Sequence, residues 1–261
     1  VIVFISLVLH HFRFPIRLKM RINKIIFTAT FIVSTLLLEH HGADCKKRPS
    51  SHPHRGKIIP YKPGRFDMTV ESKDEKILSG GKPVMKQIPD ENDPNGGGKA
   101  ICVQDIGAPK NAVWNQILGL NAYAGKVPKV KECKNYEVTR NADGSSTIKT
   151  KMVIGVLPGY KYESYYDHTF HPNDDSCVWS LDYDKYSDFD DVAGHWHIED
   201  HPKKTGCTRV FYACDIKLRG AVPGPVMNIL TKSALKSATS WVKKESEAAP
   251  ASEMPSNFAF P

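Results

Sequence analysis

The sequence predicts an α+β fold in which a curved antiparallel sheet of about seven strands wraps one long C-terminal helix. Three observations predict it. Between Lys99 and Glu247 the chain gives one strand, two short helices, six successive strands and a final helix. The strands alternate apolar and polar residues, which is typical of a sheet with one buried face. The final helix carries an apolar stripe, and the inner face of the sheet is the partner available to bury it.

Local signals set the first strand and the two short helices. Ala100–Ile106 alternates apolar positions and stops at Gly107. Pro109 suits the first turn of a helix, and Gly119 ends that helix. Leu120–Gly125 gives a second short helical turn. The apolar stripe of the first of these helices consists of Val113, Trp114, Ile117 and Leu118.

Six strands then follow without a helix between them. Turn signals at Asn141–Gly144, Leu157–Gly159 and Pro172–Asp175 separate several of them. The predicted strands are Glu132–Arg140, Thr147–Val156, Tyr160–His171, Val178–Tyr183, Val192–Glu199 and Thr208–Leu218. Pro83–Ile88 is a candidate for an additional edge strand.

The C-terminal helix begins near Pro225, which occupies a first turn without losing a needed hydrogen-bond donor. Apolar residues recur along it at helical spacing, and lysines gather on the other side, which we expect to face water. The stripe is formed by Val226, Ile229, Leu230, Ala234, Ala238, Trp241 and Val242, and the lysines are Lys232, Lys236, Lys243 and Lys244.

The chain outside this domain is predicted to divide into a targeting leader (1–43), a linker and weakly patterned segment (44–98) and a loose tail (248–261), with the domain at 99–247. Met20, an alternative true start, opens a basic stretch that precedes the apolar segment Ile25–Leu38. That layout predicts a secretory signal, because the apolar segment falls short of the roughly 20 residues that span a bilayer. The predicted location is the secretory pathway or the extracellular space; a membrane anchor or a plastid is the alternative.

The formal charge of +8 belongs to the leader and linker. Residues 1–65 hold 12 of the 36 Lys and Arg residues but 2 of the 28 Asp and Glu residues, so the rest of the chain is close to neutral. A near-neutral domain lacks the electrostatic signature of a nucleic-acid binder. The six cysteines show no CxxC spacing, and we expect buried free thiols. If a disulfide forms, Cys102 with Cys214 is favoured, and Cys177 with Cys207 is second.

The segments Ala108–Trp114 and Leu120–Pro128, followed by an extended strand at Cys133–Val138, resemble the START-like (helix-grip) superfamily. Within it, the chain looks most like the polyketide cyclase and coenzyme Q-binding START-domain family. The resemblance implies a cavity between the sheet and the C-terminal helix that binds a hydrophobic small molecule: a lipid, sterol, quinone or isoprenoid. Transient contact with a membrane is a further implied partner, and no cofactor is implied.

A cavity of this kind is lined mainly by apolar and aromatic side chains. The loop Gly155–Gly159 is similar in composition and place to the gate loop of plant abscisic-acid receptors, and Tyr186–Gly194 is the facing loop. Which sheet face is concave is left open. The pocket candidates are Trp114, Met152, Ile154, Tyr160, Tyr162, Tyr166, Trp179, Leu181, Tyr183, Trp196, Tyr212, Val226 and Leu230, with Leu157, Pro158, Gly159 and Phe189 at the mouth.

Three functions are compatible with this pattern: a carrier or chaperone of the ligand, a cyclase-like or dehydratase-like enzyme, and a ligand sensor with gate loops. The first is favoured, because the chain holds none of the compact motifs GxSxG, HExxH or the P-loop. His195 and His197 share one side of a strand, with Asp167 and His168 as candidate partners, but no motif supplies a complete metal site. General acid–base candidates are Asp182, Tyr166, His197 and Glu199. No catalytic residue is assigned.

Overall fold

The computed structural model describes residues 49–89, 98–157, 160–219 and 224–249. The leader lies outside these residues, so secretory targeting stays a prediction. The described elements are α3 (Ser72–Ser79), β1 (Val84–Pro89), β2 (Gly98–Ile106), α4 (Lys110–Leu118), η2 (Leu120–Ala122), α5 (Tyr123–Lys126), β3 (Val130–Arg140), β4 (Ser146–Leu157), β5 (Tyr160–His171), η3 (Pro172–Asp174), β6 (Ser176–Leu181), β7 (Asp191–Asp200), β8 (Thr208–Lys217) and α6 (Gly224–Ala248).

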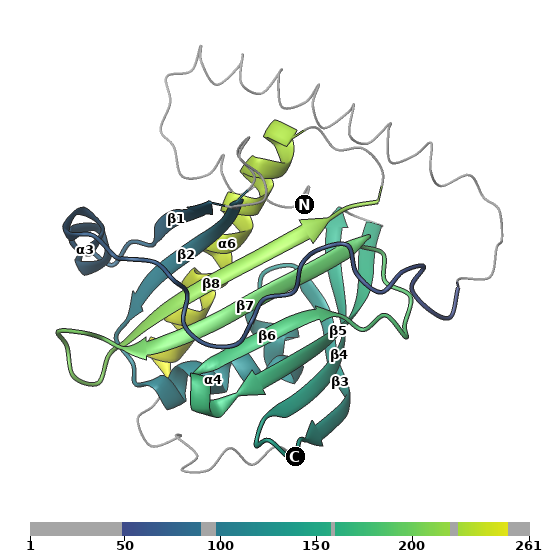
Figure 1. Ribbon diagram of the computed structural model, residues 1–261, viewed down its shortest axis with the longest axis horizontal. Coiled ribbons are helices and arrows are strands. Elements are labelled where there is room, and N and C mark those ends of the chain that lie inside the picture. Colours follow the sequence, from purple (N-terminus) through teal and green to yellow (C-terminus); the bar gives the residue numbers. More distant parts are fainter. Residues whose placement is uncertain (1–48, 90–97, 158–159, 220–223, 250–261) are drawn as a thin grey trace. The chain divides into compact units, whose positions relative to one another are not determined.

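The strands form one antiparallel sheet in the order β1-β2-β8-β7-β6-β5-β4-β3 (Figure 1). The predicted fold class is confirmed: the curved sheet lies against α6, and α4, η2 and α5 follow the long strand β2. The sheet has eight strands because β1, which covers most of the edge-strand candidate Pro83–Ile88, pairs with β2. The strand β6 ends earlier than expected, at Leu181, because the Asp182 carboxylate accepts the Asp184 backbone N–H and begins a turn.

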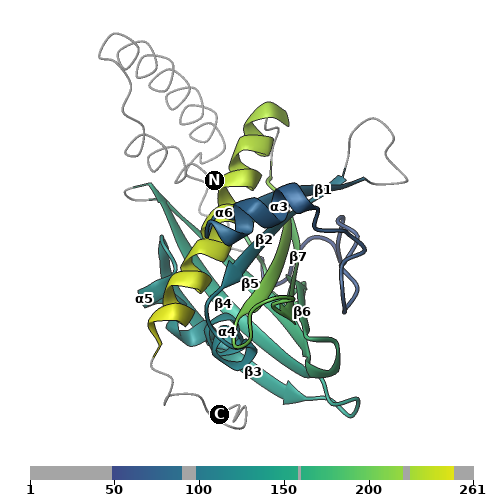
Figure 2. The same cartoon turned by 90° about the vertical axis from the view of Figure 1, so that its left-hand side faces the viewer.

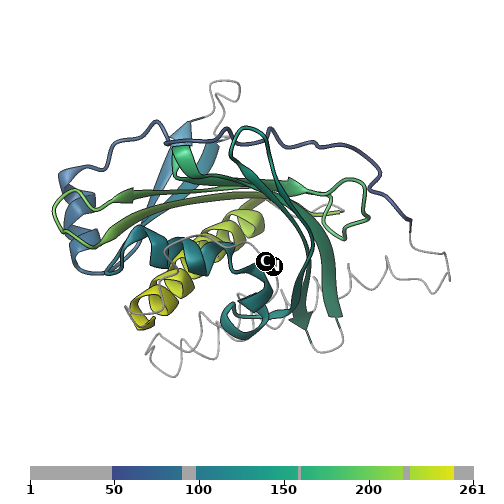
Figure 3. The same ribbon diagram turned by 90° about the horizontal axis from the view of Figure 1, so that it is seen from below.

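The two faces of the sheet are covered by different parts of the chain. Figure 3 shows α4 and α6 on the concave side and the segment that precedes α3 on the opposite, convex side. The register places Val210 and Tyr212 of β8 on the concave face and Phe211 and Ala213 on the convex face. The even-numbered residues of β4, β5, β7 and β8 therefore face α6. This answers which side of the sheet is concave, a question that the sequence left open.

Residues 50–70, which we call the strap, run across the convex face in extended form. The ring of Phe66 lies 4.3 Å from His195, and the hydroxyl of Tyr61 donates a hydrogen bond to Asp215 at 3.0 Å. The backbone N–H of Gly64 donates to the Ser176 hydroxyl at 3.0 Å. The sequence predicts a linker here because an extended segment held by isolated contacts has no apolar period. In the structure, these contacts hold the strap against the convex face of the sheet.

A buried ion-pair network fixes α3 next to the strap. The guanidinium of Arg209 on β8 pairs with Asp105 of β2 at 2.7 Å and with Glu75 of α3 at 2.6 Å. His201 also contacts Asp105, at 3.0 Å. Arg209 is only 4% exposed, so these carboxylates compensate a charge that would be costly to bury alone.

The C-terminal half of α6 lies near α4 and α5 (Figure 2). Leu235 and Val242 are fully buried, and the Trp241 ring lies edge-on to Tyr123 at 5.0 Å. Trp241 and Val242 belong to the predicted apolar stripe and confirm it there, whereas the predicted stripe omitted Leu235. Lys243 differs from the prediction that it faces water, because its ammonium group donates to the Asp105 carbonyl at 3.0 Å and pairs with Glu247.

The five described cysteines, Cys102, Cys133, Cys177, Cys207 and Cys214, are free thiols. The favoured pairing of Cys102 with Cys214 is wrong because Cys102 lies opposite Tyr212 in the sheet. Its sulfur instead lies 3.3 Å from the Thr239 hydroxyl of α6. The alternative, Cys177 with Cys207, is not formed either.

Candidate functional site

The concave face is tightly packed at one end and partly accessible at the other. Near α4, the side chains of Phe170, Cys177, Ile198 and Val210 are buried together with Val113. Farther along the same strands, apolar and aromatic side chains on the same face keep part of their surface exposed. These partly exposed residues, which we call the open half, are Met152, Ile154, Tyr162, Tyr212, Cys214 and Ile216.

An aromatic cluster that includes Tyr212 connects the packed end with the open half. Trp179 of β6 stacks on Tyr212 with ring centroids 5.7 Å apart, and Tyr212 lies 4.0 Å from Trp196. The Trp179 ring lies over Gly194 of β7. A Cβ at Gly194 would be 2.0 Å from the ring, so only glycine leaves room for it. This close approach gives the sheet a flat aromatic floor.

Polar groups on the same face are few and buried. His168 lies beside Tyr166 and Trp179, with ring centroids 5.8 and 5.9 Å away. Burial lowers the pKa of His168 to about 4, against a smaller opposing effect of the Ile148 backbone, so the imidazole is neutral at pH 7. Burial raises the pKa values of Tyr166 and Tyr212, which are therefore protonated. The concave face thus presents neutral hydrogen-bonding groups.

The loop between β6 and β7 borders the open half. The Phe189 ring points inward and stacks on Tyr162 at 5.3 Å. On its other side the loop is anchored to β5, because Asp188 and Ser187 accept the backbone N–H groups of Glu163 and Tyr165 at 2.6 and 2.9 Å. Phe189 is therefore a buried wall of the concave side, where the sequence predicted a residue of the mouth.

Most predicted pocket residues lie in one cluster. Trp114, Tyr166, Trp179, Leu181 and Trp196 are buried in it, and Met152, Ile154, Tyr162 and Tyr212 pack against it. Trp114 belongs to the packed end, where its ring lies 4.8 Å from Phe170. The side chains of Leu157, Tyr160, Val226 and Leu230, together with Pro158 and Gly159, lie outside the described residues.

Tyr183 differs from the other predicted pocket residues. It lies beyond the end of β6, and its hydroxyl donates to Asp191 at 2.8 Å. Its ring lies 5.7 Å from His52, so it serves as a contact for the strap. The sequence extended β6 by two residues, and for that reason it placed Tyr183 on the same face as Trp179 and Leu181.

The histidines considered as metal ligands lie on opposite faces. His195 and His197 belong to the convex face under the strap, whereas His168 belongs to the concave face. His197 contacts Glu199 at 3.2 Å and Asp182 accepts the Tyr136 hydroxyl at 2.6 Å, so these acid–base candidates also lie away from the open half. Among the four candidates, Tyr166 alone is in the concave cluster.

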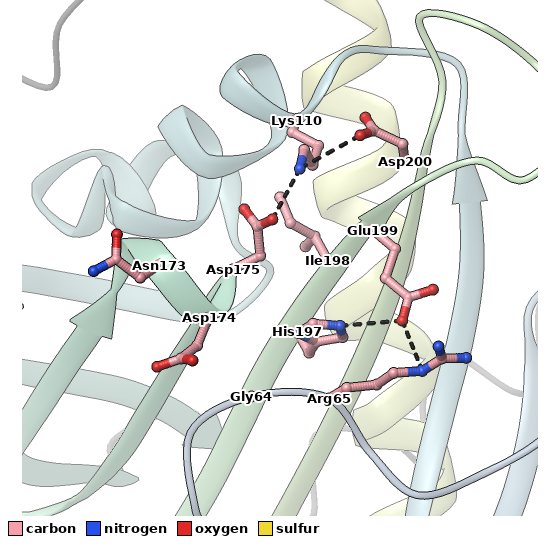
Figure 4. Close-up of a pocket in the computed structure, with 10 residues that line it drawn as sticks. All are labelled: Gly64, Arg65, Lys110, Asn173, Asp174, Asp175, His197, Ile198, Glu199 and Asp200. Atoms are coloured by element: carbon pink, nitrogen blue, oxygen red, sulfur yellow. Dashed lines mark hydrogen bonds and ion pairs between the residues drawn. The ribbon is translucent and has the colours of Figure 1, made fainter.

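A shallow pocket of about 390 Å³ lies at the rim of the sheet, beside the start of α4 (Figure 4). Both of its cationic side chains are paired with carboxylates of the same pocket: Lys110 with Asp175 at 2.8 Å, and Arg65 with Glu199 at 3.0 Å. Because this lining is charged, the pocket suits an apolar ligand less well than the open half does.

Ser164 and Cys214 belong to the concave face but are absent from the predicted site. Ser164 is 1% exposed, between Tyr162 and Tyr166 on the inward side of β5. The alternation of β5 contained the signal, since Ser164 shares its parity with the predicted tyrosines. The prediction selected large side chains and therefore omitted Ser164.

No family model and no curated protein matches this chain. Solved structures with a similar chain path include a START superfamily protein from Mycobacterium smegmatis, with 17% identity, covering 64% of this chain and 98% of that chain at a TM-score of 0.47. The Zhui aromatase/cyclase from Streptomyces sp. R1128 has 11% identity, with 66% and 100% covered and a TM-score of 0.45. The lipid transfer and protein localization domain of human StarD13 has 13% identity, with 64% and 86% covered and a TM-score of 0.47.

The element order and strand pairing are those of the helix-grip arrangement that the sequence predicts. A single antiparallel sheet, two short helical segments after the long strand β2, and a C-terminal helix across the concave face define it. Within the described part of the chain, no helix combines the length and apolarity that a membrane crossing needs.

Proposed function

We propose that the protein binds a hydrophobic small molecule, such as a lipid, sterol, quinone or isoprenoid, on the open half of the concave face, and carries or shields it. The supporting observation is the contrast along this face, from fully buried side chains near α4 to partly exposed Met152, Tyr212 and Ile216. Apolar surface left accessible inside a curved sheet is where an apolar ligand gains most from leaving water.

The expected binding energy comes mainly from burial of apolar surface. Each methylene group that leaves water contributes about 0.8 kcal/mol. The stacked rings of Trp179 and Tyr212 add a flat surface suited to a planar or fused-ring molecule. The similarity to named lipid-transfer and START proteins is compatible with this function.

An enzyme of the cyclase or dehydratase kind that uses the same face is the second candidate. The observation that favours it is the position of His168, an imidazole buried on the concave face beside Tyr166, since histidine is the most common proton-transfer group in enzymes. Turnover that is lost in a His168→Gln variant while ligand binding survives would favour this alternative over a carrier.

Native mass spectrometry of protein purified from its host, followed by organic extraction, tests the proposed function. We expect an apolar molecule in stoichiometric amount. Cys214→Phe adds bulk to the open half and should lower the bound fraction. Cys207→Phe is a matched control, because Cys207 is also partly exposed but lies in the connection between β7 and β8. Empty protein, or equal loss in both variants, would contradict the proposal.

A further inference from the structure

We infer that the ligand is an uncharged apolar molecule with a hydroxyl group, and that His168 forms the hydrogen bond to that hydroxyl. This inference rests on the proposed function and specifies the class of ligand. It is carried by two features of the concave face: the scarcity of charged groups on its described strands, where Asp200 at a strand end is the exception, and a buried polar atom without a partner.

Charge is the first feature. In the described residues of β4 to β8, the side chains that look toward α6 are apolar, aromatic or neutral polar, apart from Asp200 at the strand end. The neighbouring Lys149 and Lys151 of β4 project to the convex side, where they face Asp182 and Glu163. A carboxylate or phosphate on the concave face would therefore lose its hydration without gaining a cation, which is costly.

The unpartnered atom is the second feature. His168 is 8% exposed, and its Nδ1 is buried without a hydrogen-bond partner. Buried polar atoms are nearly always paired, so an orphan of this kind indicates a partner that is supplied from outside the chain.

The position of His168 connects its unpartnered nitrogen with the apolar open half. His168 lies opposite Trp179 on the neighbouring strand, and Trp179 stacks on the partly exposed Tyr212. The imidazole thus lies at the border between the packed end and the open half, where the leading end of an inserted molecule would stop. An apolar body would then lie on Met152, Cys214 and Ile216 in the open half.

The chemistry of the imidazole selects the group it would bind. A neutral histidine has one ring nitrogen that donates and one that accepts, and the tautomer follows its surroundings. A hydroxyl both donates and accepts, so it satisfies Nδ1 in either tautomer. A hydrocarbon satisfies neither, and a carboxylate satisfies only the donor form while bringing a buried charge.

A matched set of fluorescent probes tests the inference: pyrene, 1-pyrenemethanol and 1-pyrenecarboxylate, titrated into the full chain at pH 7. We expect 1-pyrenemethanol to bind roughly tenfold more tightly than either of the others, the size expected when a buried polar atom gains its partner. His168→Phe should reduce the difference between the alcohol and pyrene to less than about twofold, mainly by weakening the binding of the alcohol.

Two further variants complete the test. His195→Phe removes a buried histidine of the convex face and should keep the preference for the alcohol. His168→Asn introduces an amide that can form a hydrogen bond with the hydroxyl, and it should keep part of the preference for the alcohol. Equal binding of pyrene and its alcohol by the unmodified chain, or tightest binding of the carboxylate, would overturn the inference and leave the proposed function standing. No saturable binding of any probe would overturn both.

Discussion

The two faces of the sheet carry similar apolar side chains but are covered in different ways. On the convex face, Phe66 of the strap and Leu78 of α3 close over Ile101, Val103 and Phe211 in a small buried cluster. On the concave face, the helices close the end near α4 and leave the open half partly exposed. The alternation of a strand shows that two faces exist, and only the covering segments decide which face has room for a ligand.

The hydrogen bonds of the strap show why its coverage is complete. The Asp191 carboxylate accepts the backbone N–H groups of Lys57 and Ile58 at 2.5 and 2.7 Å, and the Tyr183 hydroxyl at 2.8 Å. These hydrogen bonds help to hold the Asp191 pKa below its usual value, although burial alone would raise it. Directional bonds of this kind fix the strap in one position, whereas a ligand face needs to stay adaptable.

The largest effect is expected where the convex coverage is removed. Phe66→Ala deletes a ring that is 7% exposed and packed on His195, and should reduce the free energy of unfolding by about 3–5 kcal/mol in a urea titration. Ile59→Ala, on the same strap but 68% exposed, should change it by less than about 0.5 kcal/mol. Equal small effects would mean that the strap does not cover the convex face in solution.

Gly194→Ala tests the aromatic floor of the concave face. The added methyl group would overlap the Trp179 ring, and the stack with Tyr212 would have to move. We expect a loss of about 3 kcal/mol, at the upper end for overpacking, together with weaker binding of 1-pyrenemethanol. Gly125→Ala adds a methyl group where no atom lies within 4 Å and should leave stability nearly unchanged. Unaltered unfolding of the Gly194 variant would contradict the described ring position.

His168 should make the concave face sensitive to acid. Its pKa is about 4 in the folded protein and near 6.5 in the unfolded chain, so below pH 6.5 the unfolded chain takes up the proton first. Its contribution to stability is complete above pH 6.5 and falls as the pH decreases toward 4. Over that range, neutral His168 should contribute about 3 kcal/mol less to the free energy of unfolding.

Denaturant titrations between pH 7 and pH 4, compared with His168→Phe, measure that contribution. The variant should lose less stability over this range than the unmodified chain. A parallel decrease in both proteins would show that His168 is not buried as described, and would assign the acid sensitivity to other groups such as His52, whose pKa burial also lowers.

The smallest effect concerns thiol reactivity, which compares the open half with the packed end. Burial raises the pKa of Cys214 to about 12, so reaction with a maleimide at pH 8 should be slow. Peptide mass spectrometry should find labelling fastest at Cys207, slower at Cys214 and slowest at the fully buried Cys177. Bound 1-pyrenemethanol should protect Cys214 alone. Protection of Cys177 instead would place the ligand at the packed end.

The sequence predicted the sheet well because its signals are local. Alternation and turns such as Asn141–Gly144 marked the strands within a few residues. The four-residue spacing of α6 gave an apolar stripe, which the partly buried Ala238 and the fully buried Val242 confirm. The predicted fold followed from the order of these strands and helices. Even the added strand β1 was visible as a short apolar run.

Those local signals could not predict the strap or the polar part of the candidate site. Tyr61 bonds to Asp215 and Gly64 to Ser176 across more than 100 residues, and each contact is a single residue with no repeat to detect. The pairing of His168 with Trp179 depends on register between strands, and its missing hydrogen bond depends on all that surrounds it. Sequence spacing records neither.

The room that Gly194 leaves for Trp179 also gives the protein an optical property. Trp179 and Trp196 both lie within 6 Å of the Tyr212 ring, so light absorbed by that tyrosine passes to the indoles. Trp114 and Trp241 are buried elsewhere, against Phe170 and Tyr123, and provide a steady background emission. A molecule resting on the aromatic floor would change the emission of two of the four tryptophans, so occupancy can be followed from the protein's own fluorescence.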